Sequence, residues 1–231
     1  MIRNCSLLDI SDGRLYSEND MVRADCNDCE GCSACCQGMG GSIVLDPYDC
    51  YLLMKNLSCS FEELMKESIE LHVVDGVILP NLKMNQEKDQ CHFLNEEGRC
   101  SIHAFRPGIC RLFPLGRYWD EQGEEFHYIL QTGECQKENK SKIKVKKWLD
   151  RSDLAEYDRY VKAWHDLLLT VRAEIAQIRD EVRSETPLNL EKAKAADNKI
   201  RRITMNLLQT FFVMPYEEDR DFYTQFEERL V

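Results

Sequence analysis

The hydrophobic pattern is most regular in the last third of the chain. Apolar side chains over 152–182 recur at steps of three and four residues, which predicts an amphipathic helix of about eight turns. The apolar positions of this helix are Leu154, Tyr157, Val161, Trp164, Leu168, Val171, Ile175, Ile178 and Val182. Thr186 and Pro187 then supply a helix cap and a first-turn proline. Further helices are predicted over 190–211 and 222–230, and we expect the first two helices to pack as an antiparallel hairpin.

The pattern before residue 140 is less regular and predicts short elements. Asp46 caps a helix that begins at a proline, and Ser60 opens a capping box for a second helix that extends to Ile69. Short apolar or alternating runs over 75–84 and 126–130 predict small strands. The elements together predict an α-rich α+β fold: an irregular, metal-bound cysteine lobe with small strands, followed by a C-terminal helical hairpin.

Charge and cysteine content divide the chain at about residue 140. Residues 1–140 hold all 12 cysteines and carry 13 basic against 24 acidic side chains, whereas 141–231 hold 17 of each. We therefore expect a cysteine-cluster metal-binding domain over 1–140 and a helical domain over 141–231. The lysine-rich run over 142–147 is interpreted as a solvated linker or helix face.

The composition excludes several classes of function. Of the 231 residues, 43% are hydrophobic, as in globular proteins, and the net charge of −11 argues against a general nucleic-acid binder or a binder of anionic membranes. The beginning of the chain has no apolar signal core, and no stretch reaches the roughly 20 apolar residues of a membrane span. We expect a cytoplasmic protein, in which reduced cysteines act as metal ligands rather than as disulfides.

The densest cysteine motif places five cysteines in eleven residues, over 26–36. Two residues between successive cysteines allow both thiolates to face one metal or cluster. Cys26, Cys29, Cys32 and Cys36 reproduce the spacing of bacterial ferredoxins, although Gln37 stands where that motif has proline. Adjacent side chains diverge in most backbone conformations. Two alternatives follow for Cys35 and Cys36: one ligates while its neighbour packs, or each serves a different metal.

A second group of cysteines follows at lower density. Cys91 and Cys100 flank an acidic glycine turn, which predicts that they lie on the two arms of a hairpin and face one point. Cys110 lies within the segment Arg-Pro-Gly-Ile-Cys-Arg over 106–111, and Cys135 follows.

This ordered series resembles the bacterial YkgJ-type cysteine-cluster family, whose members are described as zinc- or iron-chelating domain proteins. The resemblance covers about residues 26–136 and rests on Cys-x-x-Cys-x-x-Cys-Cys over 29–36, Cys-x-Phe-Leu, Cys-x-Ile-His and Arg-Pro-x-x-Cys-Arg-x-Phe-Pro. It implies chelation of iron, as an iron–sulfur cluster of the 4Fe–4S type, or of zinc. The metal ligands that it implies are Cys29, Cys32, Cys35, Cys36, Cys91, Cys100, Cys110 and Cys135.

Three further side chains are candidates beside the metal. His103 stands where the family commonly has tyrosine or phenylalanine, so it is a candidate ligand. Arg106 and Arg111 are candidate cofactor-binding residues, because guanidinium groups stabilise the negative charge of a thiolate-ligated cluster. The alternative is that these arginines form a buried ion pair with an acidic residue that orients the Cys110 loop. Cys50 and Cys59 are interpreted as small buried hydrophobic residues.

Three functions remain open at this point. The leading hypothesis is an iron–sulfur protein that carries electrons or serves an enzymatic reaction, with a redox or other protein partner. The second is a structural zinc module that mediates protein interaction, and the third is a protein-modifying enzyme by analogy with lysine methylases that carry a related cysteine cluster. The spacing favours the cluster. Whether the chain is an enzyme stays open.

Overall fold

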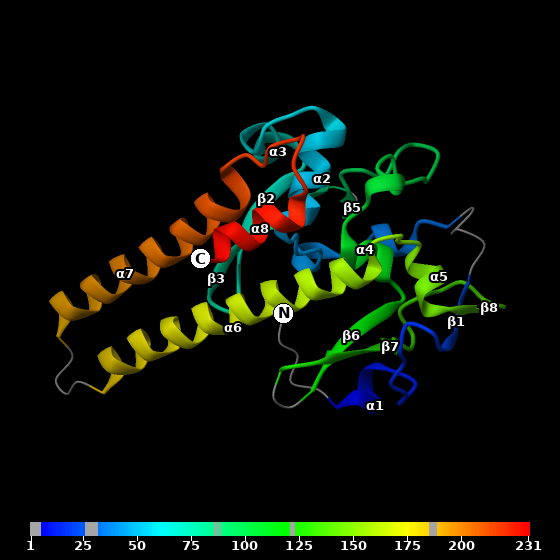
Figure 1. Cartoon of the computed structure of the whole chain (residues 1–231), viewed down its shortest axis with the longest axis horizontal. Coiled ribbons are helices and arrows are strands. Elements are labelled where there is room, and N and C mark those ends of the chain that lie inside the picture. The colour runs from blue at the N-terminus through cyan, green and yellow to red at the C-terminus, as the bar shows by residue number, and fades with distance from the viewer. Residues whose placement is uncertain (1–5, 26–31, 86, 88, 121–122, 185–188) are drawn as a thin grey trace.

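A computed structural model describes residues 6–25, 32–85, 87, 89–120, 123–184 and 189–231. The predicted α-rich fold with minor β structure is confirmed, and short helices and strands alternate before the long C-terminal helices (Figure 1). The helices are α1 (Leu7–Ile10), α2 (Pro47–Leu57), α3 (Phe61–Glu67), α4 (Gly108–Leu112), α5 (Val145–Leu149), α6 (Leu154–Arg183), α7 (Leu190–Leu208) and α8 (Phe222–Leu230). Short 3-10 turns lie at Ala34–Cys36, Gly40–Ser42 and His103–Phe105, and a π-helical turn at Gln209–Val213 extends α7.

The strands of the described residues form four separate two-stranded antiparallel ladders. The strands are β1 (Met21–Asp25), β2 (Ile69–Val74), β3 (Val77–Leu82), β4 (Met84–Asn85), β5 (Gln90–Cys91), β6 (Leu115–Trp119), β7 (Phe126–Leu130) and β8 (Ser141–Lys144). Pairs form between β1 and β8, β2 and β3, β4 and β5, and β6 and β7. The strands predicted over 75–84 and 126–130 are confirmed by β3 and β7.

Two predicted helix starts are confirmed by reciprocal capping hydrogen bonds. The amide of Asp49 donates to the carboxylate of Asp46 (2.8 Å) at the start of α2, and Asp46 donates back to Asp49 (3.2 Å). The amide of Glu63 donates to the Ser60 hydroxyl (3.2 Å), and Ser60 donates to Glu63 (2.7 Å), at the start of α3. These bonds satisfy amides that an uncapped helix would leave without acceptors.

The prediction that the second helix extends to Ile69 is wrong. Helix α3 ends at Glu67, and Ile69 begins β2. The turn that follows β2 explains the difference: Asp75 and Gly76 both have positive φ (51° and 87°), which is the backbone of a tight hairpin turn. Pairing of Ile69 with Leu82 across the hairpin outweighs the helical spacing.

The interpretation of the lysine-rich run as a linker or helix face is only partly right. The run begins in β8, where Ile143 pairs with Val22 of β1, and it continues into α5. Strand β8 could not be predicted from its own residues, because its partner β1 lies more than 100 residues away in the sequence.

The long helices match their prediction closely. Helix α6 begins at Leu154, and α6 and α7 lie side by side as an antiparallel hairpin (Figure 1). The predicted cap at Thr186 and Pro187 lies outside the described residues; the described part of α7 is capped by Asn189, whose side chain accepts from the amide of Glu191 (3.0 Å).

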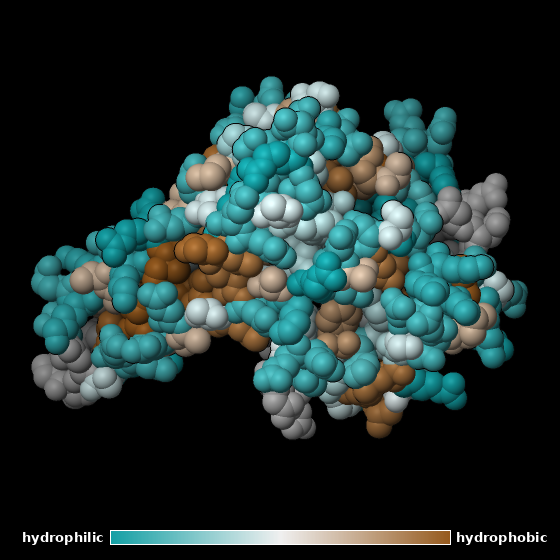
Figure 2. All heavy atoms as spheres, viewed as in Figure 1, coloured by the Kyte–Doolittle hydropathy of each residue, from teal (hydrophilic) through white to brown (hydrophobic). Residues whose placement is uncertain are grey.

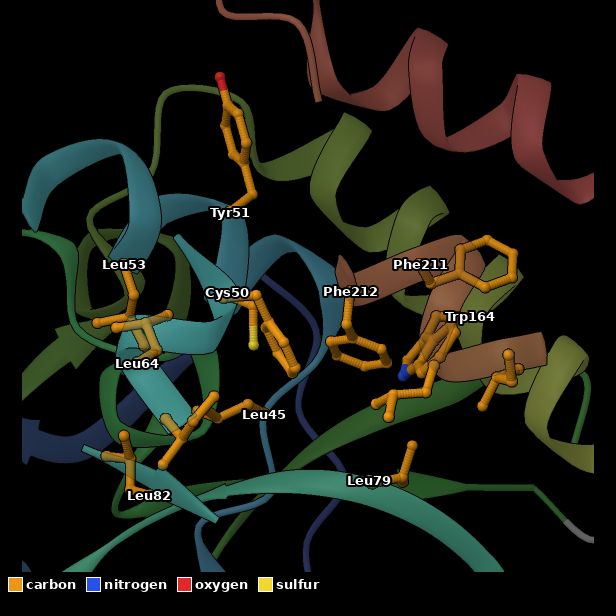
Figure 3. Packing of buried hydrophobic residues seen from close by; sticks show 14 of the residues in the cluster. Leu45, Cys50, Tyr51, Leu53, Leu64, Leu79, Leu82, Trp164, Phe211 and Phe212 are labelled. Carbon is orange, nitrogen blue, oxygen red and sulfur yellow. The ribbon is translucent and has the colours of Figure 1, made fainter. Parts of the chain in front are cut away.

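The main hydrophobic core contains side chains from both halves of the chain. Leu45, Cys50 and Leu53 pack in one cluster with Trp164 of α6 and Phe212 of the π-helical turn (Figure 3). A smaller core lies under β6, β7 and α5. The division into two domains at residue 140 stays a prediction.

The surface view shows a face that is mostly hydrophilic, apart from an apolar area over α6 and α7 (Figure 2). Among the described residues, no helix combines the length and the hydropathy needed to cross a membrane.

Candidate metal centre

Six of the predicted cysteine ligands border one cavity of about 670 Å³. We call this space, with its lining side chains, the thiol cavity. The six cysteines are Cys32, Cys35, Cys36, Cys91, Cys100 and Cys110. Cys135 is described and half-buried, but it is not part of the lining, and Cys29 lies outside the described residues. The fold therefore brings together thiols that are up to 78 positions apart in the sequence.

Cys35 and Cys36 lie on a short 3-10 turn that is attached to the strand leading to Cys91. Gln37 forms an antiparallel bridge with Gln90, and the Gly38 amide donates to the carbonyl of Asp89 (2.7 Å). Gly38 has a φ of +68°, a conformation that glycine adopts without steric cost. These backbone contacts place the turn and Cys91 on neighbouring walls of the thiol cavity.

Cys91 and Cys100 lie on the two arms of a hairpin, as predicted. Leu94 pairs with Cys100 in an antiparallel bridge, and the Asn95 amide donates to the carbonyl of Arg99 (2.9 Å). The Asn95 side chain closes the turn by accepting from the Arg99 amide (2.7 Å). Both cysteines face the thiol cavity.

Cys110 lies on α4, and this short helix is fixed by two side chains from elsewhere in the fold. The buried Asp49 carboxylate of α2 accepts a hydrogen bond from the Gly108 amide (2.7 Å). Tyr157 of α6 packs so closely against Gly108 that a Cβ atom there would overlap the tyrosine hydroxyl. Only glycine fits at this position, two residues before Cys110.

Asp49 and Tyr157 were not identified from the sequence as residues of the site. In the sequence Asp49 is the third residue of a capping box, and Tyr157 is one position of an amphipathic stripe. Asp49 and Tyr157 keep these local roles and also contact Gly108 of α4. No local sequence pattern encodes that second contact. The pairing of α2 with α6 is reinforced by the Tyr48 amide, which donates to the Tyr160 hydroxyl (3.0 Å).

The thiols of the cavity interact electrostatically. Burial raises the pKa of Cys91 and of Cys100, and the neighbouring thiolates raise both further. Burial raises the pKa of Cys110 well above its usual range, and the charges of Cys91, Asp49, Cys100 and Cys35 add to this effect. Several thiolates in one space repel one another, so a multivalent cation is needed to stabilise them together.

Cys35 is the exception among these thiols. A hydrogen bond from Cys36 lowers the pKa of Cys35 to about 7, and the positive charge of Arg106 contributes. The same hydrogen bond raises the pKa of Cys36. The two adjacent thiols therefore act on each other's charge, and which of them would bind a metal stays a prediction.

The two candidate arginines both border the thiol cavity. Arg106 contacts Nε2 of His103 and donates to the His103 carbonyl (3.2 Å), and its charge also lowers the pKa of Cys100. Arg111 donates from Nη2 to the carbonyl of Ala104 (2.7 Å). Within the described part of the chain neither arginine forms an ion pair with an acidic residue, so the ion-pair alternative finds no support there.

His103 lines the cavity, but its Nε2 atom faces Arg106. Considering only the described residues, no three His, Cys, Asp or Glu side chains converge closely enough to hold a metal ion. The chemistry of the donor set nevertheless fits zinc or iron, because thiolates are the soft ligands that these metals take in proteins. Six described thiols thus lie in the wall of one cavity, with the guanidinium groups of Arg106 and Arg111 in the same wall.

In a comparison with protein families, the family model described as "Putative zinc- or iron-chelating domain" matches residues 28–144. No curated protein and no solved structure matches the chain. The matched region contains every described cysteine that borders the thiol cavity.

Proposed function

The chain belongs to the CxxCxxCC family of zinc- or iron-chelating domains, and from this premise we propose that its thiol cavity holds an iron–sulfur cluster of the 4Fe–4S type. The observation that carries the proposal is the shared cavity of Cys35, Cys91, Cys100 and Cys110, whose charges act on one another. These four come from three separate segments, and four thiolates are what such a cluster requires.

The number of cysteines in the cavity wall supports a cluster over a single ion. One zinc ion draws four ligands to within about 2.3 Å of a point. The thiol cavity has six described cysteines in its wall, more than a single tetrahedral ion can use.

When bound, the cluster would supply one-electron transfer. Cys36 would donate its S–H hydrogen bond to the sulfur of Cys35, and Arg106 would stabilise the negative charge on Cys35 and Cys100. Asp49 would hold Cys110 in place through the Gly108 amide. An electron-transfer protein as partner and a reducing compartment, the cytoplasm, are part of this proposal.

The alternative is a structural zinc ion in the same thiols, with the protein surface binding a partner. One observation favours it: the turn with Cys35 is attached through short backbone contacts to the segment of Cys91, and such segments gain order from a metal that bridges them. A structural zinc ion would lock the three cysteine segments together.

Anaerobic purification with analysis of iron, acid-labile sulfide and zinc distinguishes the two. We expect brown protein with about four iron and four sulfide per chain. Cys110→Ser should lose most of this metal, whereas Cys50→Ala, at a fully buried cysteine outside the cavity, should keep it. Colourless protein with stoichiometric zinc would establish the alternative, and equal metal loss in both variants would contradict the ligand assignment.

A further inference from the structure

The thiol cavity extends beyond its cysteines. Part of its wall consists of Leu115 of β6, Ile143 of β8 and Trp148 of α5, which pack on or belong to the smaller hydrophobic core. The Trp148 indole is held by a hydrogen bond from Nε1 to the carbonyl of Leu112 (3.2 Å). A volume of about 670 Å³ lies within the range of small-molecule sites, which combine an apolar lining with a few polar groups.

Arg111 is one of the polar side chains in the lining of this same cavity. Its side chain is half-buried and donates one hydrogen bond, from Nη2 to the Ala104 carbonyl (2.7 Å). Burial lowers the pKa of the Arg111 guanidinium, and repulsion by the positive charges of Arg106 and Arg151 lowers it further. Within the described residues no carboxylate forms an ion pair with it, although Asp150 lies near enough to act on its charge. A guanidinium carries five N–H donors, so most of them remain to bind an anion.

We propose that this part of the cavity binds a small organic carboxylate, with its carboxylate on Arg111 and its apolar body against Leu115, Ile143 and Trp148. The planar fork of arginine matches a carboxylate with two parallel hydrogen bonds. The proposal goes beyond the metal site and holds for either metal.

The charges around the cavity favour a monoanion. Asp25, Glu134 and Asp150 belong to the same lining as Arg106, Arg111 and Lys147. These acidic groups would repel a dianion such as inorganic phosphate more strongly than a monocarboxylate. The apolar lining adds affinity for a ligand with a hydrocarbon or aromatic body.

Isothermal titration calorimetry on the metal-loaded protein tests the proposal with benzoate and its neutral isostere benzamide. We expect saturable binding of one benzoate per chain, benzamide binding roughly tenfold or more weaker, and no competition from inorganic phosphate. Quenching of Trp148 fluorescence by benzoate should follow the same curve, and should be lost in Trp148→Phe.

Variants of Arg111 assign the carboxylate to this residue. Arg111→Gln should weaken benzoate binding roughly tenfold or more and leave benzamide unchanged, because only the charged contact is removed. Arg111→Lys keeps the charge without the fork and should give an intermediate affinity. Arg159→Gln is the matched control, because Arg159 lies exposed on α6, away from the cavity.

Three results would overturn the proposal. The first is the absence of saturable benzoate binding at millimolar concentration, and the second is equal affinity for benzoate and benzamide. The third is loss of metal from Arg111→Gln in parallel with loss of benzoate, which would assign Arg111 to the metal site. Zinc in place of iron would defeat the cluster and leave the benzoate result standing, so the two failures can be told apart.

Discussion

Cys110 and Cys35 border the same cavity, but the protein holds the two residues by different means. Helix α4 with Cys110 is fixed by a buried carboxylate and a buried tyrosine from two other helices. The 3-10 turn with Cys35 is attached through backbone bonds to another short segment, the strand that leads to Cys91. Two helices of the main core thus hold Cys110, whereas backbone bonds to one neighbouring segment hold Cys35.

This difference indicates how the site is divided between protein and metal. Contacts with α2 and α6 keep their geometry without a metal, because both helices belong to the main core. Short turns open at low free energy, so we expect metal binding to add most order at the 3-10 turn that carries Cys35. The Cys91 segment is held better, because Phe93 lies buried in the main core.

Removal of the metal should have the largest effect and should distinguish the Cys110 helix from the Cys35 turn. We expect hydrogen exchange to accelerate strongly over 32–36 and less over 90–100, where Phe93 packs in the main core, while α4 and α6 keep most of their protection. Mass spectrometry of exchange in holo-protein and chelator-treated protein measures this directly. Equal loss of protection at α4 would contradict the comparison and make the metal the organiser of both segments.

Gly108→Ala should disrupt the packing of α4, the helix that carries Cys110. The new methyl group overlaps the Tyr157 hydroxyl, so the free energy of unfolding should fall by about 3 kcal/mol and Cys110 should move out of place. Tyr157→Phe removes the overlapping oxygen. The double variant Gly108→Ala with Tyr157→Phe should therefore be more stable than Gly108→Ala alone. Arg159→Gln, at an exposed position of α6 outside the cavity, is the control for denaturant unfolding and metal content.

Asp49→Ala should weaken the packing of α4 without any overlap. The Gly108 amide would lose its buried acceptor, at a cost of about 2 kcal/mol, and the Asp46 amide would lose its capping partner. Exchange at α4 should rise even in the metal-loaded protein. Asp49→Asn keeps an acceptor oxygen and should recover most of the loss. If Asn behaves like Ala, the negative charge of Asp49 rather than its hydrogen bond is what matters.

Arg106→Gln tests whether the charge of Arg106 acts on the cluster. Its positive charge favours the thiolate forms of Cys35 and Cys100 and therefore the more negative, reduced cluster. The midpoint potential should fall in this variant while the iron content is retained, which redox titration beside iron analysis detects. Unchanged potential with reduced iron content would show that Arg106 only orients the loop.

The smallest expected effect concerns the pH dependence of Cys35. Because its pKa is lowered to about 7, the Cys35 thiolate stabilises the apo fold above the usual thiol pKa, and this contribution is lost as the pH falls towards 7. Iodoacetamide should therefore modify Cys35 half-maximally near pH 7, earlier than Cys91 or Cys100. Cys36→Ala removes the S–H donor and should move this midpoint upward, and an unmoved midpoint would assign the low pKa to another cause.

The sequence predicted those parts of the fold that depend on local periodicity. Helix α6 follows from its apolar spacing, and the hairpin that carries Cys91 and Cys100 follows from the turn between them. Strand β8 could not be predicted, because its partner β1 lies at the other end of the cysteine half. The spacing of the apolar residues predicted a helix at Ile69, but Ile69 begins β2, because the turn at Asp75 and Gly76 allows β2 to pair with β3.

The cysteines of the candidate site were recognisable from their spacing, but the residues that hold them were not. Asp49 supplies a contact 59 positions along the chain, and its local role in a helix cap already accounts for it in the sequence. The hydrogen bond between Cys35 and Cys36 depends on the backbone of a 3-10 turn that residue types alone do not specify.

The contact between Gly108 and Tyr157 also sets an order of events during synthesis. The cysteines of the thiol cavity leave the ribosome before α6 does, because Tyr157 follows Cys110 by 47 residues. The nascent chain therefore exposes its thiols before the side chain that closes one wall of their cavity has been made. Metal delivered at that stage meets an incomplete site, so loading is expected to wait until the helical segment has been translated and has docked on α4.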